Sequence, residues 1–389
     1  MKILVKDCGA VGNGSKKDTV AIQKAIDECS QKGGGKVVVE SGIYLSDSLY
    51  MRDNVELHLC AGAKLQGSTN PDDYDDFRAS GFLHENCAEN SAKFLIGAIA
   101  VKNIAITGSG EVNGSGPAFY DTSAPGSGLY KKPLISRPRL VMFYDCENVK
   151  FEDSSYVDSP CWTMWLIACR NVTIHRVKVT GDQRMINNDG IDIDSCSNVT
   201  VSDCFLKTGD DCLILRAIQR TLERPAVCEN VTVSNCVLDS MCQGIRVGCP
   251  GDNIIRNCVF SNIVINGIGS GINIDNPQRY FPEGSETAMN LHDIMFSNFT
   301  ITSGRWPIRI YVEEGLKLKN ISNITFSDFR IKSKNPCLIQ GCKDTVIKDI
   351  AFNNMNIETT GEDAITSRYC KRIKMNNVEL SNFKEVDEK

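Results

Sequence analysis

Residues 169–201 read CRNVTIHRVKVTGDQRMINNDGIDIDSCSNVTV, and they contain one short unit twice. The unit is an asparagine followed by alternating β-branched residues, at Asn171–Ile174 and at Asn198–Val201. Each copy has the composition of a short strand, and the Gly- and Asp-rich residues between the copies favour turns. Further copies begin at Asn103, Asn148, Asn230 and Asn323. The chain is therefore built from repeats of one supersecondary unit.

One unit of this size cannot bury its apolar face, whereas stacked units can. Short strands, variable turns and repeat spacings of 23, 27 and 32 residues favour a solenoid. We predict an all-β chain folded as a right-handed parallel β-helix, a single domain over residues 1–389 with its main coils at 100–383. The repeated asparagines would bond one another as a ladder at one corner. Several stand in Asn-x-Ser/Thr sequons, but their repeat position favours the ladder over glycosylation.

Residues 17–35 have a different pattern. Asp18 and Thr19 resemble a helix N-cap, and Val20, Ile22, Ala25, Ile26 and Cys29 follow at helical spacing. The glycines at 33–35 would end this helix. A helix before the first coil would cover the exposed edge of a solenoid.

Composition narrows the class of protein. The 389 residues carry a net charge of −5, which argues against nucleic acid as a partner. No apolar run is long enough to span a bilayer, so we expect no membrane association. The 18 cysteines recur at repeat positions, which predicts mostly free, buried thiols and, with no signal-peptide pattern, a cytoplasmic protein. The histidines have no metal-binding spacing, and we expect no metal or other cofactor.

Five segments share a strand pattern in which apolar and polar residues alternate. They are Asp189–Asp194, Asp211–Arg216, Gln243–Gly248, Ser270–Asp275 and Trp306–Tyr311. Alternation would place the isoleucines and valines inward. The outward residues would form one patch, with Asp192, Arg246, Asn273 and Arg309 in one row and Asp194, Arg216, Asp275 and Tyr311 beside them.

Three carboxylates lie at the start of the first two segments. Because stacked strands are ~4.8 Å apart, Asp189, Asp210 and Asp211 would share one small surface. Repulsion among clustered carboxylates raises at least one pKa, which suits general acid and base work on a glycosidic bond. The alternatives are a solvated acidic turn and a calcium site.

The motifs around these residues resemble those of glycoside hydrolase family 28, the polygalacturonase family. Asn187–Asp192 is similar to the family's Asn-Thr-Asp-Gly-x-Asp motif, and Gly209–Cys212 to its Gly-Asp-Asp motif. The resemblance implies that Asp210 is the general acid. It also implies that Asp189 and Asp211 activate the attacking water, with inversion at the anomeric carbon, and that Asn187 belongs to the binding site.

The chain also departs from the family at two places. Gln243 stands where the family has histidine, and Asn273-Ile274-Asp275 stands where the family has the Arg-Ile-Lys that grips a galacturonate carboxylate. Repulsion by Asp275 predicts that plain polygalacturonate is a poor substrate, unless Arg216, Arg246 or Arg309 compensates. Trp162 and Trp306 are the aromatic residues best placed to stack on sugar rings.

The leading hypothesis is thus an inverting glycosidase that acts on a pectic or related oligosaccharide or polysaccharide. Two other classes stay open. A β-helix polysaccharide lyase would use a basic residue such as Arg246 to abstract a proton, and a non-catalytic β-helix would bind carbohydrate without turnover. The sequence makes no prediction about subunit number.

Overall fold

The computed structural model describes residues 1–80, 91–123, 128–219, 225–280 and 286–382. The chain forms two compact units. Unit 1 is Met1–Asp210, and unit 2 comprises Asp211–Gln219 and the chain that follows the segment 220–224. The single domain over 1–389 stays a prediction, and the predicted end of the main coils at 383 lies outside the described residues.

Both units consist of parallel strands, and the fold class is the predicted right-handed parallel β-helix. In unit 1 the strands of the larger of the two sheets are short. They are β1 (Lys2–Leu4), β2 (Asn13–Lys17), β3 (Gly35–Val39), β4 (Gly42–Ser46), β6 (Val55–Leu59), β7 (Ala63–Gly67), β9 (Lys102–Thr107), β10 (Glu111–Asn113), β12 (Glu147–Glu152), β13 (Ser155–Val157), β15 (Arg170–His175), β16 (Lys178–Thr180), β18 (Ser197–Ser202) and β19 (Phe205–Thr208).

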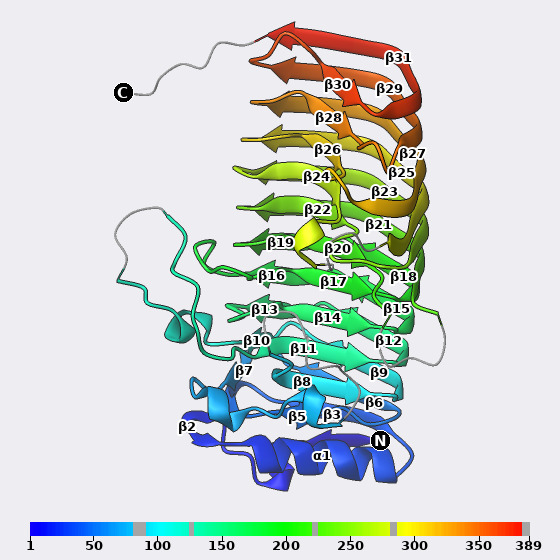
Figure 1. Ribbon diagram of the computed structural model, residues 1–389. Coiled ribbons are helices and arrows are strands. Elements are labelled where there is room, and N and C mark those ends of the chain that lie inside the picture. Colours follow the sequence, from blue (N-terminus) through cyan, green and yellow to red (C-terminus); the bar gives the residue numbers. More distant parts are fainter. Residues whose placement is uncertain (81–90, 124–127, 220–224, 281–285, 383–389) are drawn as a thin grey trace. The chain divides into compact units, whose positions relative to one another are not determined.

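In unit 2 the corresponding strands are long and bent. They are β21 (Val227–Ser240), β23 (Ile254–Gly267), β25 (Glu286–Ser303), β27 (Lys317–Ser333), β29 (Ile347–Thr359) and β31 (Cys370–Asn382). Their inward phenylalanines stack between coils, with ring centroids 4.7 Å apart for Phe260 and Phe296 and 5.0 Å apart for Phe296 and Phe326. Figure 1 shows these strands as successive layers of unit 2.

The predicted asparagine ladder is present in both units. The side-chain amide of Asn171 donates to Asn148 Oδ1 at 3.1 Å, and that of Asn198 donates to Asn171 Oδ1 at 3.1 Å. In unit 2 the amide of Asn298 donates to Asn262 Oδ1 at 2.8 Å. These asparagines have φ near +55°, in the left-handed region that asparagine tolerates better than most residues. The repeat of asparagine therefore marks the corner where each coil turns.

The predicted capping helix is α1 (Thr19–Gln31), which contacts the first strands of unit 1 (Figure 1). Ile22, Ala25, Ile26 and Cys29 are buried as expected, but Val20 is 83% exposed. Asp18 occupies the N-cap position without capping the helix. Its carboxylate accepts hydrogen bonds from the Val11 and Gly12 amides at 2.7 and 2.9 Å, because the preceding loop folds over it.

The second sheet of each unit, called here the site sheet, bears the candidate residues. In unit 1 it contains β5 (Leu49–Tyr50), β8 (Phe94–Ile99), β11 (Arg139–Tyr144), β14 (Met164–Ile167) and β17 (Ile191–Asp194). In unit 2 it contains β20 (Leu213–Arg216), β22 (Gln243–Val247), β24 (Ser270–Asp275), β26 (Ile308–Tyr311), β28 (Cys337–Gln340) and β30 (Ile365–Arg368). The predicted register holds in unit 2, where Arg246 pairs with Asn273 and Asn273 with Arg309.

The predicted outward residues do not form one exposed patch. In unit 2, Asn273, Arg216 and Asp275 are 1%, 3% and 6% exposed. Asp192 and Asp194 do point away from the apolar core, but each is 0% exposed. The outward face of β11, β14 and β17 is covered by other side chains, whereas Arg246, Arg309 and Tyr311 in unit 2 remain partly exposed. Alternation fixes the side of the sheet, but it does not reveal what lies over that side.

The cysteines in the described parts of the chain are free thiols, most of them buried. The Cys169 amide donates to Cys196 Sγ at 3.3 Å, so these two thiols lie in successive coils. Burial raises the pKa of the Cys258 and Cys337 thiols to about 12. Among the described residues, no helix combines the length and the apolar composition needed to cross a membrane.

Candidate active site

In unit 1 the loop before β17 holds Asp210 in place. The Asn187 amide donates to Asp210 Oδ2 at 3.1 Å, and the Asp210 amide donates to the Asn188 carbonyl at 3.4 Å. Asp189, which is 4% exposed, is fixed from the preceding coil because its carbonyl accepts from the Thr163 amide at 2.9 Å. The structure thus places Asp210 directly against the segment that carries the predicted residues Asn187 and Asp189.

The close packing of the backbone next to Asp210 requires a glycine at position 209. A Cβ atom on Gly209 would lie 2.2 Å from the Met185 carbonyl oxygen, closer than atoms can approach. The backbone of residues 185–188 can therefore pass next to Asp210 only because residue 209 has no side chain. In the Gly-Asp-Asp motif, the glycine therefore permits the close approach of residues 185–188, and the two aspartates that follow it supply the carboxylates.

Two residues that the sequence did not indicate support this loop. Arg137 is 3% exposed, and its Nη1 donates to the Tyr120 hydroxyl at 2.5 Å and to the Ile186 carbonyl at 2.8 Å. Its Nη2 donates to Asn187 Oδ1 at 3.0 Å. The Tyr120 hydroxyl donates in turn to the Ile186 carbonyl at 2.5 Å. Neither residue belongs to the repeat, so no pattern in the sequence could have identified them.

In unit 2 a partly exposed arginine joins two of the predicted aspartates. Arg246 Nε and Nη2 donate to the two carboxylate oxygens of Asp275 at 2.9 and 3.0 Å, and Nη1 donates to Asp211 Oδ2 at 3.2 Å. Burial alone would lower the pKa of the Arg246 guanidinium, but the two carboxylates raise it well above its usual value. Arg246 is thus a permanent cation shared by Asp211 and Asp275.

Arg309 extends this cluster onto the next coil. Its Nη1 donates to Asn273 Oδ1 at 3.1 Å and lies 3.7 Å from Asp275 Oδ2. The guanidinium lies over the rings of Tyr311 and Trp306, 4.1 and 5.5 Å from their centroids. Burial lowers the pKa of Arg309 from its usual value. Unlike the indole of Trp162, that of Trp306 is partly exposed, so it offers an accessible aromatic surface next to a cation.

The other predicted residues of unit 2 lie around the same group. Arg216 is 3% exposed, and its charge and that of Arg246 both act on the buried Cys249 thiol. Burial raises the pKa of Cys249 to about 12, so this thiol stays protonated despite its cationic neighbours. Gln243 begins β22, pairs in register with Ser270, and is partly exposed.

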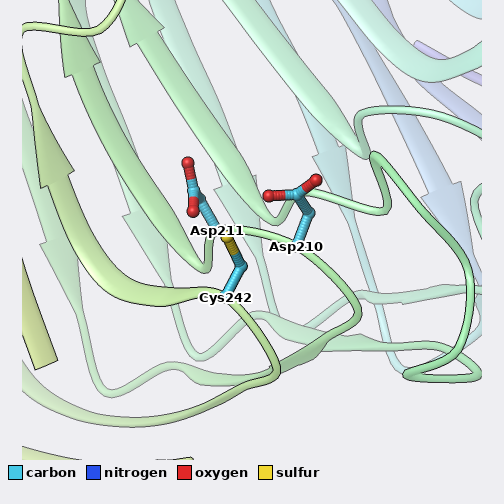
Figure 2. Close-up of side chains that lie close together, drawn as sticks. All are labelled: Asp210, Asp211 and Cys242. Carbon is cyan, nitrogen blue, oxygen red and sulfur yellow. The ribbon is translucent and has the colours of Figure 1, made fainter. Parts of the chain in front are cut away.

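Figure 2 shows Asp210 and Asp211, which are consecutive in the chain, together with Cys242. The Asp211 carboxylate and Cys242 Sγ lie within 4.8 Å of each other and could act as metal ligands. A metal ion there would meet the Arg246 guanidinium, which already binds Asp211. This repulsion disfavours a cation, and the group is better suited to acid and base chemistry.

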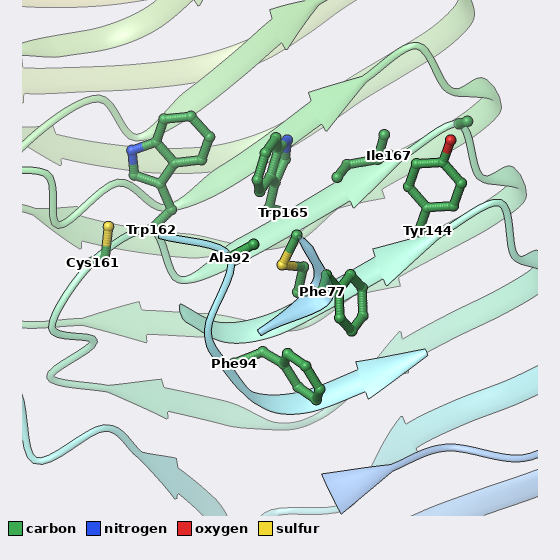
Figure 3. Close-up of a cluster of buried hydrophobic side chains, with 10 residues drawn as sticks. Phe77, Ala92, Phe94, Tyr144, Cys161, Trp162, Trp165 and Ile167 are labelled. Carbon is green, nitrogen blue, oxygen red and sulfur yellow. The ribbon is translucent and has the colours of Figure 1, made fainter. Parts of the chain in front are cut away.

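Trp162, predicted to stack on a sugar, is buried in unit 1 at 4% exposure, in a hydrophobic cluster with Trp165 and Phe77 (Figure 3). Its ring centroid is 5.0 Å from that of Trp165, and the Arg139 guanidinium lies 4.8 Å from it. It therefore offers a sugar much less surface than Trp306 does.

Comparisons with known proteins agree with the motifs. The model of the family described as glycosyl hydrolases family 28 matches residues 29–223. A probable polygalacturonase from Vitis vinifera is 27% identical over 217 residues, which cover 54% of this chain and 43% of that protein. A probable polygalacturonase from Arabidopsis thaliana is 24% identical over 406 residues, which cover 95% of this chain and 77% of that protein.

Among solved structures, the exopolygalacturonase of Thermotoga maritima superimposes with a TM-score of 0.75 at 20% identity. The match covers 97% of this chain and 92% of that one, and it shows that the two share a fold. The residues that the family model matches make up half of the chain and include Asn187, Asp189, Asp210 and Asp211. The chain belongs to glycosyl hydrolase family 28.

Proposed function

We propose that this protein hydrolyses a glycosidic bond of a pectic saccharide, with inversion at the anomeric carbon. The observation that carries the proposal is the contrast between two consecutive carboxylates. Asp210 accepts a hydrogen bond from the neutral Asn187 amide, whereas Asp211 is bound by the Arg246 guanidinium. An adjacent cation stabilises the ionised form of a carboxyl group, which suits Asp211 to the role of a base.

In this mechanism Asp210 donates a proton to the glycosidic oxygen as the bond breaks. Asp211, which pairs with Arg246, and Asp189 orient and deprotonate the attacking water. Asp210 is the more exposed of the two consecutive aspartates, in keeping with a group that must reach the leaving oxygen. The family's use of the matching carboxylates supports this assignment of roles.

The test is Asp210→Asn, which keeps the size of the side chain and removes the acidic proton. General acid catalysis contributes about 10²–10⁴-fold, and we expect a loss of this size on a natural pectic oligosaccharide. Aryl glycosides with activated leaving groups should lose less, because they need little protonation. A matched control is Asp72→Asn, since that side chain is 89% exposed on the same unit.

Near wild-type rates for the natural saccharide with Asp210→Asn would refute this role. Proton NMR of the anomer first released tests inversion, and release of the retained anomer would contradict it. An unsaturated product absorbing in the ultraviolet would instead identify a lyase. Saccharide binding without any turnover by the wild-type protein would identify a non-catalytic β-helix.

We further propose that plain polygalacturonate is a poorer substrate than a pectic saccharide with a neutral sugar facing Asn273 and Asp275. Arg246 and Arg309 do reach Asp275, so they reduce its repulsion of a sugar carboxylate. The donors of Arg246 are nevertheless engaged by Asp275 and Asp211, and a sugar carboxylate would have to compete for them. We expect a preference of about 10–30-fold in kcat/KM, which corresponds to roughly 1.4–2 kcal/mol.

The measurement compares homogalacturonan oligosaccharides with alternating pectic oligosaccharides of the same length. Equal kcat/KM values for the two series would refute this substrate preference and leave the hydrolase assignment standing.

A further inference from the structure

The interior of the last coil of unit 2 is open to solvent. The inward residues of β29 are buried at 1% exposure or less, and they are Ile350, Phe352, Met355 and Ile357. Their register partners in β31 are Ile373, Met375, Val378 and Leu380. In β31, however, Met375 is 52% exposed and Leu380 is 39% exposed. The apolar core of unit 2 therefore reaches water at this strand.

The same strand has an open edge. β31 pairs in parallel with β29 from Cys370 to Asn382, and on its other side the described part of unit 2 supplies no strand. Figure 1 shows β31 as the outermost layer of the unit. Such an edge presents rows of N–H and C=O groups with which another chain can pair. The first strands of unit 1, by contrast, are contacted by α1.

The bend of β31 has a symmetric sequence around it. The strand turns between the inward residues Met375 and Val378, and Asn377 at the turn has φ of 51°. A two-fold axis through this bend would exchange its two arms, so a second copy would run antiparallel with its bend at the same place. Residues equally far from the midpoint of the bend would then face each other. The facing pairs are Ile373 with Leu380, Met375 with Val378, Lys374 with Glu379, and Asn376 with Asn377.

These facing pairs are complementary. The apolar pairs would close the open interior, and the exposed Lys374 and Glu379 would meet as opposite charges, which favour pairing across strands. Lysine on an edge strand usually discourages pairing, but here each lysine has a carboxylate opposite it. In the same register Lys371 and Arg372 would lie opposite Asn382 and Ser381, so no like charges meet.

We propose that two copies of this protein associate through residues 373–380 of β31, whose edges pair antiparallel about the bend at Asn376 and Asn377. The occupant is a second copy because the charges, the apolar positions and the bend all match their own two-fold image. A slip of one residue would set inward side chains against outward ones, so the apolar pattern fixes the register. The proposal does not depend on the glycosidase function.

Analytical ultracentrifugation of the full chain measures the association. We expect the wild type to be a dimer at about 50 µM. Lys374→Glu would set a carboxylate against Glu379 of the second copy, and Glu379→Lys would set an ammonium against its Lys374. Each change should raise the dissociation constant by at least about 100-fold, since like charges across an interface are strongly unfavourable. The control Lys348→Glu makes the same charge change on an exposed residue of β29 and should leave the constant unchanged.

Charge reversal separates this interface from a general loss of structure. In an equimolar mixture of Lys374→Glu and Glu379→Lys chains, opposite charges face each other at both positions, so the mixture should form heterodimers. The double variant with both changes should dimerise like the wild type. Circular dichroism establishes that each variant is folded.

Three results would overturn the proposal. The first is a wild-type chain that stays monomeric at about 50 µM. The second is a dimer that survives both single substitutions, because its interface would then lie elsewhere. The third is a mixture of the two single variants that remains monomeric. A chain that dimerises only after removal of residues 383–389 would also contradict the proposal, because it would assign the open edge to that segment.

Discussion

Strands β11, β14 and β17 in unit 1 and strands β22 and β26 in unit 2 have the same alternation of residues but different outward faces. In unit 1 the polar outward residues Asp192, Asp194 and Arg139 are buried under an aromatic cluster. In unit 2 the polar outward residues Arg246 and Arg309 are partly exposed and form ion pairs with Asp275.

The difference teaches that one repeat can carry two kinds of surface. A covered face gains stability from apolar packing, and specific partners offset the cost of burying its charged groups. A face left partly open gains little from packing, and its arginines and aspartates hold one another in place. We expect the first kind to respond to changes of side-chain volume and the second kind to changes of charge.

The largest effect on stability should come from the covered face. Trp165→Ala removes a side chain that is 0% exposed and that binds Asp194. Such a truncation should lower the free energy of unfolding by about 3–5 kcal/mol. Trp306→Ala, on the open face of unit 2, should lower it by less than about 1 kcal/mol. Urea denaturation measures both, and equal losses would show that the two faces do not differ in packing.

Charge should dominate on the open face. Arg246→Met leaves Asp211 and Asp275 without their shared cation, and we expect a loss of about 3 kcal/mol in unfolding free energy. Adding Asp275→Asn should recover part of this loss. A suitable control is Arg256→Met, because its ion pair with Glu229 is more exposed and should contribute at most about 1 kcal/mol.

The double variant tests whether the charge of Asp275 causes the loss. A double variant as unstable as Arg246→Met alone would mean that the uncompensated charge of Asp275 is not its source. Recovery of about 1–3 kcal/mol would instead measure the coupling between the two side chains.

The fold, the strand register and the asparagine ladder could be predicted because every copy of the repeat has the same pattern of residues and the same local structural preference. The pairing of Arg246 with Asn273 follows from aligning the segments that begin at Gln243 and Ser270. The close placement of Asn187, Asp189 and Asp210 likewise follows from stacking the coil that carries Asn187–Asp192 on the coil that carries Gly209–Cys212.

What the sequence could not predict lies in segments that belong to no repeat. Phe77, Ala92, Tyr120 and Arg137 lie outside the strands, Phe77 in the short 3-10 helix Phe77–Ser80, and their positions depend on tertiary packing that no periodicity encodes. For the same reason the sequence does not predict the burial of Asp192. The alternation around it is that of an exposed strand, and only the loops decide that it is covered.

A substitution of Arg137 tests whether this buried residue of unit 1 positions the catalytic loop. Lysine at this position could not reach Ile186, Tyr120 and Asn187 together, because a single ammonium replaces a planar group with five donors. We expect Arg137→Lys to reduce kcat by about 10–100-fold with little change in KM, since small displacements of reacting groups have effects of this size.

The control for Arg137 lies in the same unit. Arg184→Lys alters an arginine that pairs with Asp182 on the protein surface, and kcat should change by less than about twofold. A rise in KM with unchanged kcat for Arg137→Lys would mean that Arg137 supports substrate binding and does not position the catalytic loop.

The smallest effect should be the same in both units, because the asparagine ladder runs through each of them. Asn171 and Asn262 are both exposed, have φ of 55° and 56°, and each donates one ladder hydrogen bond and accepts another. Replacement by alanine removes both bonds and leaves a residue that tolerates the left-handed region poorly. The expected loss is about 1–2 kcal/mol in unfolding free energy at either site.

Glycine separates the two causes of this loss, because it lacks the ladder bonds but accepts a positive φ without strain. Asn171→Gly and Asn262→Gly should therefore be more stable than the alanine variants by about 1 kcal/mol. If glycine and alanine are equally destabilising, the ladder hydrogen bonds account for the whole effect. A loss at Asn171 that clearly exceeds the loss at Asn262 would mean that the difference between the two units extends from the site sheet to the opposite corner of the coil.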